Sequence, residues 1–204
     1  MIKLYHAPGS CSLAVKIALK LANIEFDTIN INVMEGEHLT EKYKQINPLS
    51  KVPALVKDEG TLTEGAAILQ YIAEYAPESA LLPATGTFAK AEALKWMMFV
   101  YSNLHPHWAR AFVPTRYGQD EASIKRIAEE HINALYDIIE VQLASHKFLA
   151  GDVLSVADLY LVVATHWQGV LSQSLTERRP NLQRYINTLL DIPIINECIK
   201  SELM

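Results

Sequence analysis

The spacing of hydrophobic residues changes along the chain, from short runs in the first third to helical stripes in the remainder. Residues 2–5 form a short apolar run, and residues 27–33 alternate apolar with polar positions, as a half-buried strand does. Between them, residues 11–22 place apolar side chains at helical spacing. Strand, helix and strand at this spacing predict a parallel βαβ unit.

The next stretch predicts two more strands and a helix. Residues 34–45 are charged and predict a loop with a short helix, whereas residues 52–56 form a buried strand with Pro53 near its start. Proline is tolerated at the first residues or the edge of a strand, and a cis bond is another reason to keep it there. Residues 61–63 predict a returning antiparallel strand, after which Thr63 is expected to cap a helix over residues 64–76.

Beyond the first third, only helical patterns follow. A long helix over residues 89–112 is expected to kink at Pro106, and the later helices are expected at residues 120–145, 155–172, 181–190 and 194–203. Ser155 and Asp158 have the spacing of a capping box, which predicts structural roles for both. The fold class is therefore α/β followed by all-α, with a mixed sheet in a first domain (residues 1–78), a linker (79–86) and a helical bundle (87–204).

Composition narrows the classes of function. The chain has 204 residues, of which 50% are hydrophobic, and a net charge of −5 without any basic stripe, which argues against nucleic acid as the main partner. No apolar stretch approaches the ~20 residues of a membrane span, and no secretory signal is visible at the N-terminus. Cys11 and Cys198 are the only cysteines and make no disulfide framework, so reduced thiols in the cytoplasm are expected.

Cys11 stands where the first strand ends and the first helix begins. Pro8 and Gly9 break the chain before it, and Ser10 is a suitable N-cap. In the first helical turn, unpaired N–H groups and the helix dipole favour an anion, and the thiolate is the reactive form of cysteine. A small buried cysteine is equally compatible with this stretch taken alone, so both readings stay open at this point.

Short motifs run in order through nearly the whole chain. They are Leu4-Tyr5, Pro8-Gly9-Ser10-Cys11-Ser12-Leu13, Asn47-Pro48, Val52-Pro53-Ala54-Leu55, Leu62-Thr63-Glu64-Gly65, Leu104-His105, Ala150-Gly151-Asp152, Val156-Ala157-Asp158 and Pro180-Asn181-Leu182. In this set the chain resembles the cytosolic glutathione S-transferases, most closely the bacterial beta class. The resemblance implies a thioredoxin-like N-terminal domain with a four-stranded sheet, a cis peptide before Pro53, and a homodimer that binds glutathione without a metal.

The resemblance also implies a role for residues of the first domain. Cys11 is expected to face the glutathione sulfur, and Val52 and Pro53 to offer a strand edge to the cysteinyl segment of the tripeptide. Glu64 and Gly65 open a helix whose N–H groups suit the γ-glutamyl carboxylate, and Lys51 is expected near the glycyl carboxylate. Each of these motifs also has an alternative role that needs no ligand: Val52–Pro53 turns the chain, and Glu64 complements the helix dipole.

In the helical domain, His105 occupies the place where the beta class has a cleft histidine, which donates to the sulfur or acts as a base. Ser102 and Asn103 are expected to reach glutathione, across the dimer interface. Trp108, Phe112 and Tyr117 are candidate walls of a pocket for the electrophile, although each suits a helical core equally well.

The chain departs from the beta-class pattern at several basic or polar positions. Met34-Glu35-Gly36 and Met98 stand where Lys and Asn are common, Leu49-Ser50-Lys51 replaces Lys-Gly-Gln, and Pro106 follows His105. The function expected is conjugation of glutathione to small hydrophobic electrophiles, as in detoxification. Two alternatives stay open: monothiol exchange through a mixed disulfide at Cys11, and a binding or regulatory protein that keeps the fold without catalysis.

Overall fold

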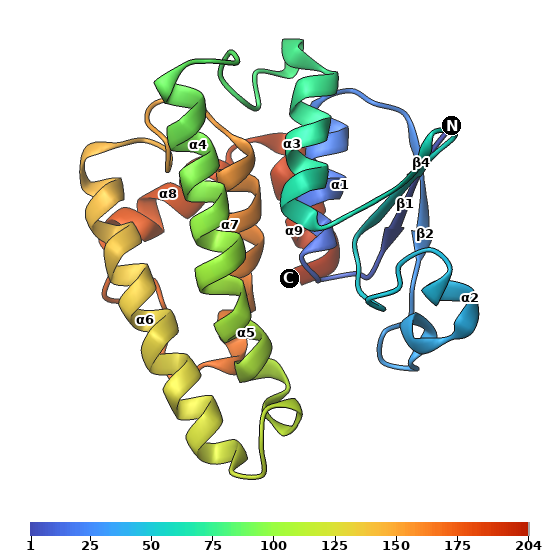
Figure 1. Cartoon of the computed structure of the whole chain (residues 1–204). Coiled ribbons are helices and arrows are strands. Elements are labelled where there is room, and N and C mark those ends of the chain that lie inside the picture. The colour runs from blue at the N-terminus through green and yellow to red at the C-terminus, as the bar shows by residue number, and fades with distance from the viewer. Residues whose placement is uncertain (204) are drawn as a thin grey trace. The chain divides into compact units, whose positions relative to one another are not determined.

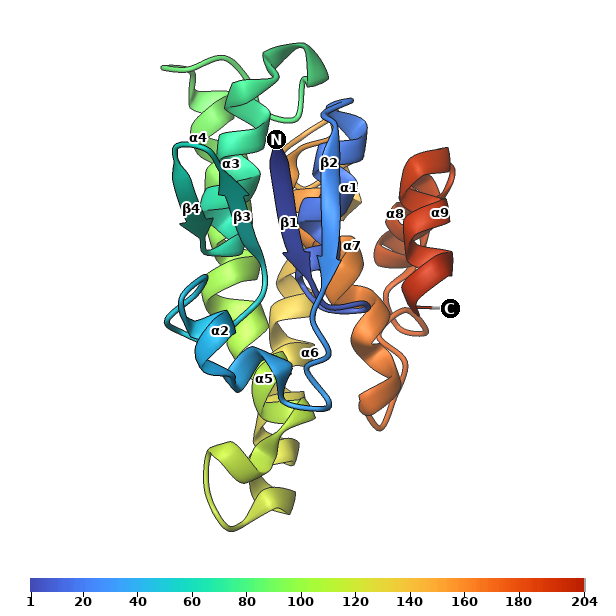
Figure 2. The ribbon, with the colours of Figure 1, turned by 90° about the vertical axis from the view of Figure 1, so that its right-hand side faces the viewer.

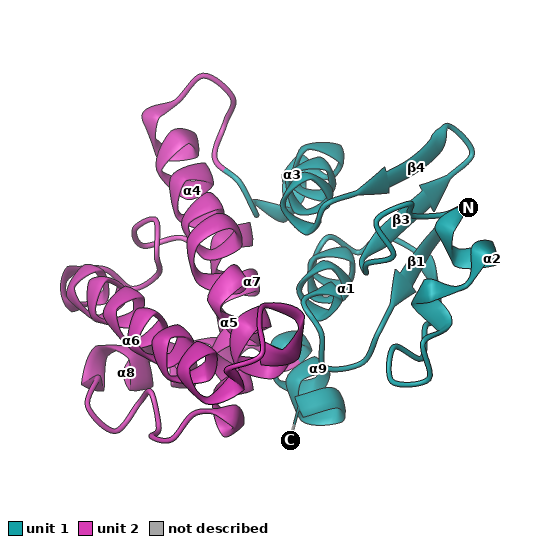
Figure 3. Cartoon of the chain, turned by 60° about the horizontal axis from the view of Figure 1, so that its bottom comes forward, with its two compact units in different colours: residues 1–82, 194–204 teal, residues 83–193 magenta. Residues whose placement is uncertain are grey.

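The computed structural model describes residues 1–203, and Met204 lies outside the described residues. The chain divides into two compact units, coloured separately in Figure 3. Unit 1 contains residues 1–82 and 194–204, and unit 2 contains residues 83–193. The last helix therefore belongs with the N-terminal unit, whereas the sequence analysis assigned all of residues 87–204 to the helical domain.

Unit 1 is built on a four-stranded mixed sheet with the strand order β2-β1-β3-β4, which Figure 2 shows side by side. Its strands are β1 (Ile2–His6), β2 (Phe26–Asn30), β3 (Ala54–Lys57) and β4 (Gly60–Thr63). β1 pairs parallel with β2 and antiparallel with β3, and β3 pairs antiparallel with β4. The predicted βαβ unit and the returning strand are confirmed.

Two helices pack together on this sheet. α1 (Ser12–Leu21) and α3 (Gly65–Tyr75) contact each other, and their apolar stripes are fully buried. Figure 1 shows both helices on the same side of the strands. The connection after β2 contains η1 (Glu37–Leu39) and α2 (Glu41–Lys44), and η2 (Pro77–Ser79) follows α3. Burial of the two stripes fixes the end of β1 and the start of α1, where Cys11 lies.

α9 (Pro193–Leu203) packs beside α1, as Figures 1 and 3 show. Its apolar stripe, formed by Ile195, Cys198 and Ile199, is buried. Two ion pairs join it to α1: Lys16 Nζ lies 2.7 Å from Glu202 Oε1, and Lys20 Nζ lies 3.6 Å from Glu197 Oε1. These contacts explain why the end of the chain belongs to unit 1, which the periodicity of residues 194–203 alone does not reveal.

Unit 2 is helical. Its helices are α4 (Phe88–Met98), η3 (Phe99–Leu104), α5 (His105–Phe112), η4 (Pro114–Arg116), α6 (Glu121–Ser145), α7 (Val156–His166), η5 (Trp167–Val170) and α8 (Pro180–Leu190). α7 is buried on nearly all sides, as its apolar sequence predicts. Together with the mixed sheet of unit 1, this unit confirms the expected fold class.

Asp158 anchors the start of α7. Its carboxylate accepts hydrogen bonds from the N–H and the hydroxyl of Ser155, from the N–H of Leu149 and from the hydroxyl of Tyr185. Asp158 is fully buried, and burial raises the pKa of its carboxyl. The predicted structural roles of Ser155 and Asp158 are borne out by these bonds.

Two local expectations are wrong. The long helix over residues 89–112 is not one kinked α-helix, because a π-helical turn, η3, separates α4 from α5. Pro106 lacks an N–H and its ring crowds the carbonyl four residues earlier, so the disruption falls on the preceding turn. Thr63 does not cap α3, because it ends β4 and Glu64 occupies the N-cap position.

Candidate functional site

The segment that joins β1 to α1, residues 7–12, is here called the thiol loop. Ser10 N–H donates to the Ala7 carbonyl at 3.1 Å, and Ser10 Oγ accepts from Ser12 N–H at 3.2 Å. Cys11 already has helical dihedral angles, φ −57° and ψ −20°, one residue before the assigned start of α1. Cys11 therefore occupies the N-cap position of α1, one residue later than the cap that the sequence predicts at Ser10, and the Ser10 hydroxyl still accepts from the N–H of the first helical residue.

Cys11 and Cys198 are both thiols, and they lie in different environments. The Cys11 side chain is partly exposed, and its Sγ lies 3.5 Å from the Val52 carbonyl oxygen, to which the thiol donates. Cys198 is buried in α9, and burial raises the pKa of its thiol. Of the two, Cys11 is the thiol that a solute can reach.

Val52 presents backbone hydrogen-bonding groups next to Cys11. The Val52–Pro53 peptide is cis, as the resemblance implies, and β3 begins only at Ala54. Within residues 1–203, the Val52 N–H has no hydrogen-bond partner, and the Val52 carbonyl is contacted by the Cys11 thiol. A short extended peptide can pair with such groups as an added strand.

Two residues that sequence reasoning did not assign to the site hold the backbone just before Val52 by hydrogen bonds. Tyr43 Oη and Asn47 Nδ2 both donate to the Lys51 carbonyl, at 2.8 Å and 2.7 Å. Asn47 Oδ1 also accepts from the Leu49 N–H at 3.0 Å. Burial, aided by the nearby charges of Tyr5 and Cys11, raises the pKa of Tyr43 to about 12, so its hydroxyl remains a donor at neutral pH. The Asn47-Pro48 motif was a signal for Asn47, whereas nothing local in the sequence marked Tyr43.

Glu64 holds an unusual backbone conformation at the start of α3. Its φ is +68°, in the region that residues other than glycine rarely adopt, and its side chain is exposed. Such a conformation costs about 1–3 kcal/mol and persists where surrounding structure imposes it, often at ligand sites. Gly65 is buried and opens α3, whose first N–H groups have no partners within the helix. A carboxylate is the ligand that suits this helix start.

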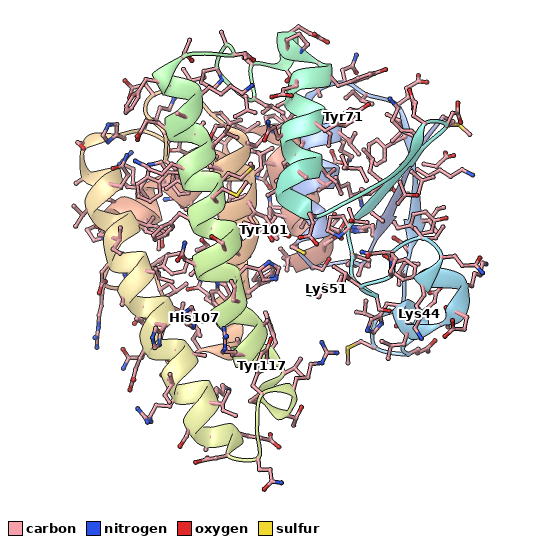
Figure 4. The ribbon with its side chains drawn as sticks, viewed as in Figure 1. Lys44, Lys51, Tyr71, Tyr101, His107 and Tyr117 are labelled. Carbon is pink, nitrogen blue, oxygen red and sulfur yellow. The ribbon has the colours of Figure 1, made fainter. Side chains whose placement is uncertain are left out.

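Lys51 lies just before the cis peptide, where Figure 4 labels it, and its side chain is exposed. Its ammonium group makes no ion pair within the described part of the chain. By contrast, Lys16 and Lys57 of the same unit are each paired with a glutamate. Lys51 is thus available to a negatively charged group that approaches Val52.

In unit 2, His105 is the first residue of α5, directly after the π-helical turn. Its Nδ1 lies 2.5 Å from the hydroxyl of Tyr160, a fully buried residue of α7. Its ring also packs against Trp167, with the ring centres 5.3 Å apart. These contacts fix the orientation of the imidazole, and Tyr160 is a partner that sequence reasoning missed.

Ser102 and Asn103 both have exposed side chains in the π-helical turn. The Ser102 hydroxyl donates to the Met98 carbonyl at 2.7 Å, and Asn103 Nδ2 lies 3.3 Å from Ser102 Oγ. The exposed π-helical turn leaves the Asn103 amide oxygen accessible to a partner molecule.

The three aromatic candidates differ in exposure. Phe112 is 46% exposed and Tyr117 is 48% exposed, and the Arg110 guanidinium lies 5.1 Å from the centre of the Tyr117 ring. Trp108 exposes no surface, because it packs against Tyr136 and Trp167 in the interior of unit 2. The expectation that Trp108 lines a pocket is therefore corrected, and its role is in the core.

Among residues 1–203, no group of three or more His, Cys, Asp or Glu side chains comes together as a metal site would require, and none of the helices there is long and apolar enough to cross a bilayer.

Two family models match the chain. The glutathione S-transferase N-terminal domain matches residues 1–74, and the glutathione S-transferase C-terminal domain matches residues 90–193. The chain belongs to the glutathione S-transferase family. The resemblance that the motifs indicated is confirmed, and so is the prediction of a transferase enzyme.

Individual relatives agree with this assignment. Glutathione S-transferase GST-4.5 of Xanthomonas campestris is 36% identical over 169 residues, which cover 81% of this chain and 82% of the relative. A beta-class glutathione S-transferase of Sphingomonas chungbukensis has a TM-score of 0.85 and 32% identity, over 98% of both chains. A sphingomonad glutathione S-transferase, solved in complex with glutathione, has a TM-score of 0.86 and 33% identity, again over 98% of both chains.

Proposed function

We propose that this transferase binds glutathione on unit 1 and joins its thiol to small hydrophobic electrophiles. The observation that carries the proposal is the pairing of Cys11 with Val52: a partly exposed thiol lies 3.5 Å from the carbonyl of Val52, whose N–H has no partner among the residues that the structure describes. A cysteine-containing peptide that pairs with the Val52 backbone would bring its sulfur beside Cys11.

The charged and polar groups around Cys11 and Val52 match the three charged groups of glutathione. The γ-glutamyl carboxylate suits the first N–H groups of α3 at Gly65, and the ammonium group suits the exposed Glu64 carboxylate. The exposed Lys51 ammonium, which has no ion pair among residues 1–203, suits the glycyl carboxylate. The strained Glu64 backbone further supports a ligand site at this position.

In the reaction, the glutathione thiol loses its proton and its sulfur attacks the electrophilic carbon. A sulfur–carbon bond forms, and the leaving group departs with its electron pair. Cys11 stabilises the attacking thiolate by donating a hydrogen bond from its own thiol. In unit 2, His105, which Tyr160 orients, is suited to act as a donor or a base, and the exposed Phe112 and Tyr117 offer apolar surface.

The setting of this activity follows from the family resemblance. We infer a homodimer that acts in the cytoplasm to detoxify electrophiles, with the exposed Ser102 and Asn103 reaching glutathione across the dimer interface. Light scattering on the purified protein tests the dimer: twice the mass of the 22.9 kDa chain is expected, and a monomeric mass would contradict it.

The activity is tested with purified protein, glutathione and a panel of electrophiles that includes chlorodinitrobenzene. Conjugation is expected for the wild type, and Cys11→Ala is expected to lower its rate while leaving part of it, because the Val52 and Gly65 groups still bind glutathione. Thiol exchange measured with a mixed-disulfide substrate should disappear in Cys11→Ala, because no sulfur remains to form the intermediate. Failure of the wild type both to bind glutathione and to conjugate any electrophile would refute the proposal.

A further inference from the structure

A buried carboxylate in the last turn of α9 lies directly beneath the thiol loop. The Glu202 side chain is only 6% exposed, and the hydrogen bonds it accepts come from residues of unit 1. It accepts from His6 Nε2 at 3.0 Å, from Lys16 Nζ at 2.7 Å and from the backbone N–H of Gly9 at 3.0 Å. Nothing in the sequence motifs marks Glu202, which lies 191 positions after Cys11 along the chain.

The carboxylate sets the direction of a chain of hydrogen bonds. An ionised carboxylate only accepts, so His6 must carry a proton on Nε2. His6 is fully buried, and in its neutral form Nδ1 then accepts from Ser12 Oγ, which lies 2.7 Å away. Ser12 Oγ also accepts from the Ala7 N–H at 3.1 Å, lies 2.7 Å from Ser10 Oγ and lies 3.3 Å from the Ala7 carbonyl oxygen. His6 thus joins the Glu202 carboxylate to both hydroxyl groups of the thiol loop.

The same carboxylate also holds the loop directly, through Gly9. Gly9 has a φ of +71°, and a side-chain carbon added there would lie 3.4 Å from both the Glu202 carbonyl oxygen and a methyl carbon of Leu203. The loop backbone thus passes close over the last turn of α9. Glu202 fixes residue 9, two positions before Cys11, and through His6 it fixes Ser12, the residue after Cys11.

We propose that Glu202 is a positioning residue for Cys11: it holds both flanks of the thiol loop, so that the Cys11 thiol keeps the place beside Val52 that glutathione binding requires. The proposal rests on the proposed function for its catalytic consequence. The hydrogen bonds of the Glu202 carboxylate go to His6, Lys16 and Gly9, so it acts on Cys11 through the loop.

The test compares Glu202→Gln with Glu197→Gln. Both residues are on α9 and pair with a lysine of α1, but Glu197 is 73% exposed and its ion pair lies outside the thiol loop. His6 donates to both carboxylate oxygens, Lys16 to Oε1 and the Gly9 N–H to Oε2, so either orientation of the amide in Glu202→Gln places its NH2 group against the His6 donor that holds the loop and against one further donor. Both variants are measured at a temperature where circular dichroism shows that they are folded. Glu202→Gln should then raise the KM for glutathione and slow alkylation of Cys11 by iodoacetamide, each about tenfold, because a small displacement of the Cys11 thiol weakens both binding and reaction.

In the same experiment, the KM for the electrophile should be unchanged, Glu202→Asp should restore part of the loss, and Glu197→Gln should behave as wild type. Mass spectrometry of tryptic peptides separates alkylation of Cys11 from that of Cys198. A folded Glu202→Gln variant whose glutathione KM and Cys11 alkylation stay within twofold of wild type would overturn the proposal. Alkylation needs no glutathione, so it tests the positioning role even where the proposed function fails.

A measurement on the wild type avoids any question of folding. The nitrogen-15 spectrum of the imidazole groups should report a proton on His6 Nε2, the atom that donates to Glu202. A His6 Nε2 that carries no proton would overturn the proposal.

Discussion

Removal of the Glu202 carboxylate should destabilise the protein at neutral pH and have little effect in acid. Burial alone would raise the pKa of this carboxyl, but the hydrogen bonds from His6, Lys16 and the Gly9 N–H outweigh burial and lower its pKa to about 2, from an ordinary value of 4.5. A carboxyl whose pKa is lower in the folded state stabilises the fold above its unfolded pKa, and this stabilisation disappears as pH falls toward the folded pKa.

The pKa shift sets the size of the effect. A shift of one pKa unit corresponds to about 1.4 kcal/mol, so the lowering from 4.5 to about 2 corresponds to roughly 3 kcal/mol at neutral pH. For a chain of this length, 1 kcal/mol moves the melting temperature by about 2–4 °C. From this free energy and this change in melting temperature per kcal/mol, we expect Glu202→Gln to melt about 6–12 °C below the wild type at pH 7.

The assay is thermal or urea unfolding of the wild type and Glu202→Gln between pH 7 and pH 3. The two stabilities should converge below pH 4.5, where the carboxyl of the unfolded wild type begins to take up a proton. Glu197→Gln is the matched control, because an exposed ion pair contributes about 0–1 kcal/mol. A difference between Glu202→Gln and wild type that stays constant from pH 7 to pH 3 would refute the reasoning, as would an equal loss in Glu197→Gln.

Four further substitutions test contacts within each of the two units. Asp158→Ala should lower the free energy of unfolding by about 3–5 kcal/mol, because it leaves four buried donors without their acceptor. Ser155→Ala should lower it by only about 1 kcal/mol. Equal losses for the two variants in urea unfolding would contradict this. Asn47→Ala removes two hydrogen bonds behind Val52 and should raise the KM for glutathione about tenfold with little change in kcat, since each bond contributes about 1 kcal/mol; a pure loss of kcat would argue against a binding role. Tyr160→Phe should lower kcat several-fold, about 1 kcal/mol of activation free energy, by releasing His105; an unchanged kcat and pH profile would show that His105 needs no fixed orientation.

Local pattern was enough to predict most elements of the fold. Alternation and helical spacing located the strands and helices, and the Val52–Pro53 motif marked the cis peptide. The capping box of Ser155 and Asp158 was also visible, because a cap depends on residues within one turn, whereas the cap predicted at Ser10 falls one residue later, at Cys11.

What sequence could not predict depends on residues far apart in the chain. The return of α9 to unit 1 rests on Glu202 meeting His6 and Lys16, which no periodicity encodes. The hydroxyl of Tyr160 orients His105 from a helix that lies 55 positions further along the chain. The π-helical turn before Pro106 was read as a kink, because periodicity does not distinguish a bend from an inserted wider turn.

Glutathione binding on unit 1, along Cys11, Val52 and Gly65, can be tested by a crystal structure of the protein with glutathione. We expect backbone hydrogen bonds between the cysteinyl residue of glutathione and Val52, the γ-glutamyl carboxylate at the first N–H groups of α3, and the ligand sulfur in contact with Cys11 Sγ. Glutathione bound elsewhere, or bound here with its sulfur directed away from Cys11, would contradict it.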